Sequence, residues 1–186
     1  MPIAAPSANR FTEVSPTTAE HVRRSLGDRV DYILDGGPCT EGIESTVLTL
    51  AGPSPVLLRP GGISRAEIEA AIGSVSSAPD PITGTAHASP GLHQRHYSPR
   101  TRLYLVEKGE VPLEGKGAYL KLIHPPKRAV AELVTMPTSP KGYAARLYEV
   151  LHFLDVRGLD WIAVEAPPDL PDWEAIWDRL RRAVFR

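Results

Sequence analysis

The sequence predicts an α/β protein with two folded parts joined by a linker. Short β-branched runs alternate with capped helical segments before residue 75, and a Ser-, Ala- and Pro-rich stretch without apolar periodicity follows. Further strand-like runs and two amphipathic helical patterns come after residue 100. We expect a twisted sheet in the first part, and a small, mostly parallel sheet covered by helices in the second.

Composition places the chain among ordinary globular proteins. Of its 186 residues, 42% are hydrophobic and 23% are charged, and 21 basic side chains nearly balance 22 acidic ones. This balance gives no general attraction to RNA or to an anionic membrane. No apolar run is long enough to cross a bilayer, and the single Cys39 fits a reducing compartment, so we expect a cytoplasmic protein without membrane association.

Capping boxes mark the helices of the first part. Residues 17–20 and 64–67 have the spacing of such boxes, apolar residues follow each on one helical face, and Gly27 and Gly73 follow as stop signals. Three β-branched or apolar runs bounded by Gly and Pro are predicted strands: 30–34, 45–50 and 55–59.

The second part alternates strand and helix patterns. A long helix is predicted near 141–157, because apolar residues recur there at three- and four-residue spacing. A last helix at about 172–185 carries Trp173, Ile176 and Leu180 on one face, and we assign its arginines, including Arg179, to the solvated face. The predicted strands are 102–106, 118–123, 129–136 and 161–165.

The segment at the N-terminus is rich in small polar side chains. It reads PIAAPSANR, and Ser15-Pro16-Thr17 follows at the predicted helix start. Groups such as Ser7, Asn9 and Ser15, held by prolines beside unpaired helix N–H groups, suit an anionic ligand such as a phosphate. The alternative is that all three are ordinary turn and capping residues.

Two glycine-rich stretches are further candidates. The run LDGGPCTEGIESTV places Ser45 at a strand mouth, where backbone can approach a ligand; a plain hairpin connection is the alternative. Arg59 ends the apolar strand in LLRPGG, where it presents its planar guanidinium to a phosphate or carboxylate or lies in a surface turn. Cys39 has no neighbouring base in the sequence, so a nucleophilic role is the weaker interpretation.

The linker stretch PGLHQRHYSP concentrates functional side chains where no core is built. Two His, an Arg and a Tyr in this segment favour a role in covering a ligand. His93 and His96 have only H-x-x-H spacing without further ligands, so we predict no metal site made of protein side chains.

Together, the motifs PIAAPSANRFTEVSPTTAEHV, ILDGGPCTEGIESTVL, LLRPGGIS and PGLHQRHYSP resemble the Sua5/YrdC/YciO family in order and spacing, and specifically its two-domain Sua5 type. The resemblance covers residues 2–99 by motif, and the remainder by position and β/α pattern. It implies part of a YrdC-like domain over 1–75, a linker over 76–100 and a small Rossmann-like Sua5 domain over 101–186.

The resemblance also implies an activity. Family members of this type combine L-threonine, bicarbonate and ATP, with Mg²⁺, into L-threonylcarbamoyladenylate and pyrophosphate. The adenylate is the activated donor of the threonylcarbamoyl group of t6A at adenosine-37 in certain tRNAs. The implied partners are therefore the three substrates and the proteins that carry out t6A transfer, whereas direct tRNA contact is not indicated by the charge of this chain.

Site residues follow from the resemblance motif by motif. Tyr97 resembles the linker residue that folds over the nucleotide, Asn9 is a support between two serines, and Ala5 acts through its backbone. No protein nucleophile is implied, because adenylate formation needs donors arranged around phosphates in a closed, dry site. The implied ATP-binding residues are Ser7, Asn9, Ser15, Arg59 and Tyr97, and the implied threonine-binding residues are Ala5 and Ser45.

The sequence departs from the family pattern at its start. It begins at the PIAAPSAN motif, and the family's basic K-x-R segment has no counterpart, so we expect the 186-residue chain alone to have little or no synthase activity. Two other classes stay open: a non-catalytic nucleotide- or tRNA-binding module on the same scaffold, and a hydrolase that uses Cys39.

Overall fold

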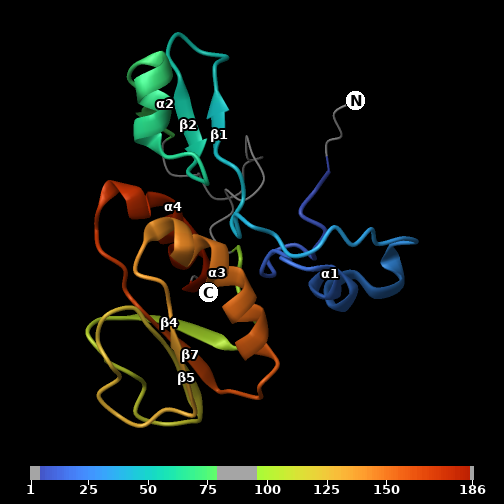
Figure 1. The fold of residues 1–186 in the computed structure, drawn as a ribbon, viewed down its shortest axis with the longest axis vertical. Coiled ribbons are helices and arrows are strands. Elements are labelled where there is room, and N and C mark those ends of the chain that lie inside the picture. The colour runs from blue at the N-terminus through green and yellow to red at the C-terminus, as the bar shows by residue number, and fades with distance from the viewer. Residues whose placement is uncertain (1–4, 79–95, 185–186) are drawn as a thin grey trace.

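The computed structural model describes residues 5–78 and 96–184, and Figure 1 shows how their elements are arranged. Helix α1 and a small sheet, both from the first 78 residues, lie at separate places around a larger C-terminal unit. The predicted α/β class is confirmed. Within the described ranges, no helix has the length and apolar character needed to traverse a membrane.

Helix α1 (Ala19–Leu26) forms where the sequence predicts it. Its N-cap is Thr18, whose side chain accepts a hydrogen bond from the His21 N–H, and it ends at Gly27 with φ 54°, a left-handed conformation that glycine adopts readily. The cap is therefore one residue later than the predicted box at 17–20. A 3₁₀ turn, Gly27–Arg29, follows.

The predicted strand at residues 30–34 is wrong. Tyr32 and Leu34 are 90% and 95% exposed, and this segment joins neither of the sheets that the described residues form. The preference of β-branched and aromatic residues for strands depends on packing against neighbouring strands, which is missing here.

The small sheet has the order β1-β2-β3. Strands β1 (Val47–Thr49) and β2 (Val56–Arg59) are antiparallel, and β3 (Ser76–Ser77) runs parallel to β2. Two of the three strands predicted in the first part are thus confirmed, and residues 76–77, at the start of the predicted linker, belong to this sheet. Helix α2 (Arg65–Ile72) begins with the predicted capping box of Ser64 and Glu67, of which both hydrogen bonds are present.

The C-terminal unit contains a parallel sheet of order β4-β7-β5-β6. Its predicted strands and helices are confirmed, except that the last helix opens with a short 3₁₀ turn, Pro171–Trp173. The elements are β4 (Arg102–Val106), β5 (Gly117–Lys121), β6 (Glu132–Thr135), α3 (Pro140–Asp155), β7 (Trp161–Glu165) and α4 (Glu174–Val184).

The main core lies between this sheet and the two helices α3 and α4. Leu120 and Ile162 of the sheet belong to one buried cluster with Leu147 of α3 and Leu180 of α4. Alternate strand residues such as Tyr119 point to the other face, which connecting segments cover. In Figure 1, α3 and α4 lie between the sheet and the first part of the chain, so both helices can contact the segments predicted to bind ligands.

Candidate functional site

The segment before α1 runs alongside the end of the predicted linker. The Ser98 N–H donates to the Thr12 carbonyl at 2.9 Å, and Glu13 and Ser98 form a parallel β-bridge. This pairing places side by side the segments that carry Ser15 and Tyr97, two of the predicted ATP-binding residues, and both residues are buried.

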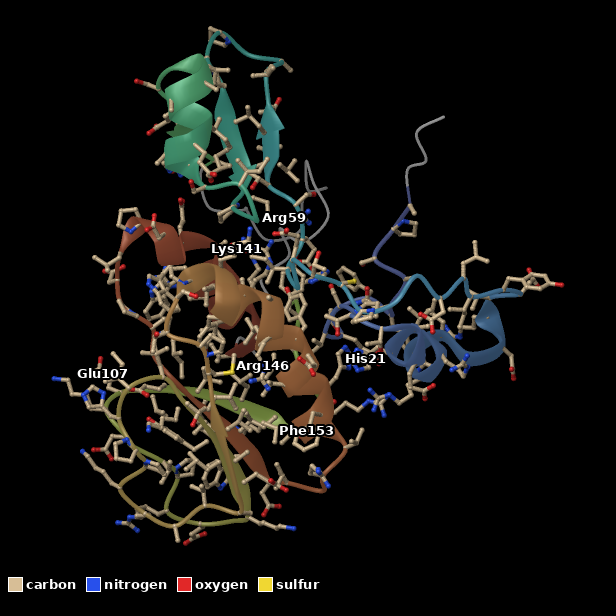
Figure 2. All side chains as sticks on the ribbon, in the orientation of Figure 1. His21, Arg59, Glu107, Lys141, Arg146 and Phe153 are labelled. Carbon is tan, nitrogen blue, oxygen red and sulfur yellow. The ribbon has the colours of Figure 1, made fainter. Side chains whose placement is uncertain are left out.

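Arg59 and Ser45 are joined by hydrogen bonds. Nε and Nη2 of Arg59 donate to the Ser45 carbonyl at 3.2 and 3.0 Å, and Nη2 lies 3.5 Å from Ser45 Oγ. Gly61 permits this approach, because a Cβ at that position would lie 2.3 Å from the Thr46 nitrogen. Figure 2 shows Arg59 at the end of the small sheet that faces the helices of the C-terminal unit. A predicted nucleotide-binding residue and a predicted threonine-binding residue are therefore neighbours.

An ion pair between Glu44 and the buried Arg179, whose side chains are 14% and 0% exposed, lies between these two pairs of residues. Nε of Arg179 donates to Glu44 Oε2 at 2.7 Å, and the same carboxylate accepts from Ser15 Oγ and from the Tyr148 hydroxyl. Nη2 of Arg179 donates to the Pro60 carbonyl at 3.0 Å, next to Arg59 in the chain. We call this group of neighbouring residues the Glu44 cluster; its members are Ser15, Glu44, Ser45, Arg59, Pro60, Tyr97, Tyr148 and Arg179.

Tyr97 has unused hydrogen-bonding capacity within the cluster. Its ring lies 5.0 Å from the Arg179 guanidinium carbon and stacks on Tyr148 at 5.7 Å. Its φ of 58° places a bulky aromatic residue in the strained left-handed region. Its hydroxyl is buried without a hydrogen-bond partner among the described residues, and burial raises the pKa of that hydroxyl.

The charges of the ion pair are balanced inside the protein. Burial alone would raise the pKa of the Glu44 carboxyl, but the Arg179 guanidinium and the Ser15 hydrogen bond outweigh burial, so this pKa is lowered and Glu44 is ionised at neutral pH. Asp178 Oδ2 pairs with Nη1 of Arg179 on another side. Arg179 is thus neutralised by two carboxylates.

The remaining predicted residues lie at the N-terminal segment. Ala5 and Ser7 are exposed. Asn9 Nδ2 donates to the carbonyls of Arg10 and Glu13 and so shapes the turn, whereas its Oδ1 is buried without a partner in the described part of the chain. Within the described part of the chain, no hydrogen bond or ion pair joins Ala5 or Ser7 to the Glu44 cluster, and their predicted roles stay predictions.

Sequence reasoning missed the charged pair at the centre of the cluster. The assignment of Arg179 to a solvated face is wrong, because its exposure is 1%. A signal was present: Arg179 stands three residues after Ile176 and one before Leu180, on the apolar face of α4. Nothing local distinguishes Glu44 from the exposed Glu41 in the same loop, because its partner is 135 residues away.

A cavity of about 290 Å³ lies next to the cluster, between the turn at 60–65 and the beginnings of α3 and α4. Pro60 lines this cavity, but none of the seven predicted site residues lines it. We therefore take the Glu44 cluster, and not the cavity, as the candidate site. Within the described ranges, no group of three or more His, Cys, Asp or Glu side chains is placed to hold a metal ion. His93 lies outside those ranges, and Cys39 is exposed.

Comparison with known proteins separates the chain into two matched regions. Residues 63–184 match the family model described as threonylcarbamoyl-AMP synthase, C-terminal domain. Residues 1–61 match the Sua5/YciO/YrdC model, described as telomere recombination. The matches leave out only residue 62 and the last two residues.

Relatives cover nearly the whole chain. The threonylcarbamoyl-AMP synthase of Bacillus subtilis is 35% identical over 99% of this chain, and that of Pyrococcus abyssi is 34% identical over 98%. The crystal structure of P. abyssi Sua5 complexed with L-threonine superposes on 98% of this chain with a TM-score of 0.83 and 32% identity. The chain spans 57% of the length of both synthases and 58% of the crystallised chain.

Proposed function

The chain belongs to the Sua5 family of threonylcarbamoyl-AMP synthases, and on this premise we propose that the Glu44 cluster is part of a site that converts L-threonine, bicarbonate and ATP into L-threonylcarbamoyladenylate, pyrophosphate and water. The observation that carries the proposal is the hydrogen-bonded contact between Arg59 and Ser45. It supports the binding of nucleotide and amino acid side by side.

The reaction requires this proximity. L-Threonine and bicarbonate form a carbamate, whose oxygen attacks the α-phosphorus of ATP while pyrophosphate leaves. Arg59 supplies a fixed guanidinium for the phosphates, and its two hydrogen bonds to the Ser45 carbonyl hold that group beside the amino acid. The buried Tyr97 hydroxyl is a donor available to the nucleotide, and its ring excludes water from the labile product.

We also propose that Mg²⁺ enters with ATP. The described residues offer no cage of three or more acidic, His or Cys side chains, and Glu44 is already paired with Arg179. This fits an ion that is held mainly by phosphate oxygens and water, as Mg²⁺ commonly is, and that neutralises phosphate charge.

The product would pass to proteins that transfer the threonylcarbamoyl group to tRNA, in the cytoplasm. The net charge of −1 does not favour strong binding of RNA by this chain itself. Salt-dependent RNA binding by the isolated chain, without any response to ATP or L-threonine, would instead support the RNA-binding module.

Calorimetric titration of the chain with Mg·ATP, and separately with L-threonine, tests the proposal. We expect Arg59→Ala to weaken ATP binding by about tenfold or more, because hydrogen bonds to charged groups are lost. Ser45→Ala should weaken L-threonine binding more than ATP binding. The matched control is Arg128→Ala, an exposed arginine in the segment between β5 and β6.

The titrations also distinguish the proposed function from a non-catalytic binding module. Equal ATP affinity in the wild type and Arg59→Ala, or no ATP binding by the wild type, would overturn the proposal. ATP binding that never responds to L-threonine would favour a non-catalytic nucleotide-binding module. Any pyrophosphate release should require both L-threonine and bicarbonate and should fall in Arg59→Ala.

A further inference from the structure

We infer that Arg179 of α4 is a positioning residue that fixes three predicted ATP-binding residues at once, so that the C-terminal helix sets the affinity for the nucleotide. The inference rests on the proposed function for the identity of the ligand. Its structural part, the connection from α4 to the three residues, stands on the contacts of Arg179 alone.

Each nitrogen of the guanidinium has a different partner. Nε donates to Glu44, whose other oxygen accepts from Ser15 Oγ, and Nη2 donates to the Pro60 carbonyl, directly after Arg59. The guanidinium carbon lies over the Tyr97 ring, 5.0 Å from its centre. Arg179 therefore contacts the segments that carry Arg59 and Tyr97 directly, and it is linked to Ser15 through the Glu44 carboxylate.

Burial shows why an arginine is needed here. Arg179 is 1% exposed, and burying a cation in the protein interior is costly unless its donors are satisfied. Nη1 is satisfied by Asp178, so all three nitrogens are used and the charge is not available to phosphate. Lysine is a point charge on a flexible stem and cannot donate in these three directions while facing an aromatic ring.

Helix α4 is held in place by core packing and by hydrogen bonds to the end of the predicted linker, and these contacts fix the position of Arg179. Ile176 and Leu180 are buried in the main core on either side of it. The Ser98 hydroxyl donates to the Ala183 carbonyl at 3.0 Å, and the His96 N–H donates to the Arg182 carbonyl at 3.3 Å. The end of the predicted linker is thus bound to α4 by backbone as well as through Tyr97.

The test compares Arg179→Lys with Arg181→Lys. Arg181 is a matched control, because it lies on the same helix and over an aromatic ring, Trp177, at 4.9 Å, but is exposed and outside the cluster. In calorimetric titrations of the folded chain, we expect Arg179→Lys to weaken ATP binding by about tenfold and to leave L-threonine binding within about twofold. Arg181→Lys should change neither.

The split between the two ligands separates positioning from general destabilisation. Equal losses for ATP and L-threonine, or unchanged ATP affinity in a folded Arg179→Lys chain, would overturn the inference. A wild-type chain that fails to bind ATP would instead overturn the proposed function.

Hydrogen–deuterium exchange of the ligand-free chain tests the connection without a ligand. We expect faster exchange in residues 12–16 and 96–98 of Arg179→Lys than of Arg181→Lys, because these segments lose their common anchor. Unchanged exchange in both segments would overturn the inference whatever the titrations show.

Discussion

At the scale of single residues, the site depends on how one carboxylate is used. Glu44 accepts hydrogen bonds from a hydroxyl of the first part, a phenol of α3 and a guanidinium of α4. An ion pair taken out of water contributes little net stability, but removal of one partner is costly because the other charge stays buried. The pair therefore acts chiefly to specify which segments meet.

The lowered pKa of Glu44 predicts an acid-sensitive contribution to stability. Because the carboxyl binds its proton less tightly in the folded chain than in the unfolded chain, its contribution is present above the ordinary glutamate range and is lost as pH falls through the lowered pKa. We expect Glu44→Gln to lower the free energy needed to release the first part from the C-terminal unit by about 3 kcal/mol near neutral pH, and the difference from the wild type to shrink on acidification.

Urea unfolding followed by far-UV circular dichroism, whose signal includes α1 and α2, measures this difference at a series of pH values. Glu41→Gln is the control, because Glu41 is an exposed acid three residues earlier in the same loop. A difference between the wild type and Glu44→Gln that stays constant down to strongly acidic pH would contradict the prediction.

Motifs predicted those site residues whose surroundings are local. Arg59 is followed directly by Pro60 and Gly61, Ser45 lies at the end of a glycine-rich run, and Tyr97 stands in a linker with no core to build. Glu44 and Arg179 gain their roles only from a contact 135 residues apart in sequence. Such a pair resembles two surface charges until the fold is known.

At the scale of elements, helices α1 and α3 meet through two stacked histidines. The rings of His21 and His152 are 3.9 Å apart, and His152 Nε2 lies 3.1 Å from the Ser15 carbonyl. Figure 2 shows His21 on the side of α1 that faces α3. Burial, with His152 and then Arg24, lowers the pKa of His21 to about 4 from its ordinary 6.5.

This contact predicts a loss of stability at mildly acidic pH. The unfolded chain protonates His21 as pH falls through its ordinary range, whereas the folded chain resists until about pH 4, so stability falls over that window. We expect His21→Phe, which keeps a ring against His152, to lose less unfolding free energy than the wild type between about pH 7 and pH 5. Equal losses in urea titrations of both chains would refute this.

The Trp161 side chain of β7 lies directly over Gly117 of β5, so that a larger residue at this position would clash with the indole ring. A Cβ at Gly117 would lie 2.0 Å from the Trp161 ring. We expect Gly117→Ala to lower the unfolding free energy by about 1–3 kcal/mol, because the indole must move within a packed face. Gly36→Ala, with nothing within 4 Å of the added atom, is the control and should be nearly neutral. A neutral Gly117→Ala would show that this face is loosely packed.

Element prediction succeeded where the pattern itself was sufficient. The apolar spacing of α3 and the continuous apolar run of β7 each predict a buried surface, and this prediction does not depend on which element packs against that surface. Residues 30–34 have the same strand-like composition, yet a strand also needs a hydrogen-bonding neighbour, and composition carries no information about one.

At the scale of the whole molecule, the two parts differ in how many buried hydrophobic residues each contributes. Among the buried hydrophobic residues of the described chain, only Val14, Leu57 and Val75 come from residues 5–78, and Val14 packs into the core of the C-terminal unit. The first part therefore depends for its position on contacts with the C-terminal unit, which include the packing of Val14 and the ion pair between Glu44 and Arg179.

This dependence predicts how the chain unfolds. All three tryptophans lie in residues 161–177, so their fluorescence reports on the C-terminal unit, whereas far-UV circular dichroism also includes α1 and α2. In the wild type we expect the two urea transitions to coincide, because the parts are held together. In Glu44→Gln, the dichroism signal should begin to fall at lower urea while the fluorescence midpoint stays near that of the wild type.

The physical reason for the split is that separation of the parts relieves the unpaired charge. When Gln replaces Glu44, Arg179 keeps its ion pair with Asp178 but loses its ion pair with residue 44. Release of the first part then exposes the guanidinium to water, which removes the cost of a poorly paired buried charge. The eight-residue helices α1 and α2 are too short to persist without tertiary contacts, so they melt on release. If both signals instead shift together to lower urea, the chain is one cooperative unit and the ion pair supports all of it equally.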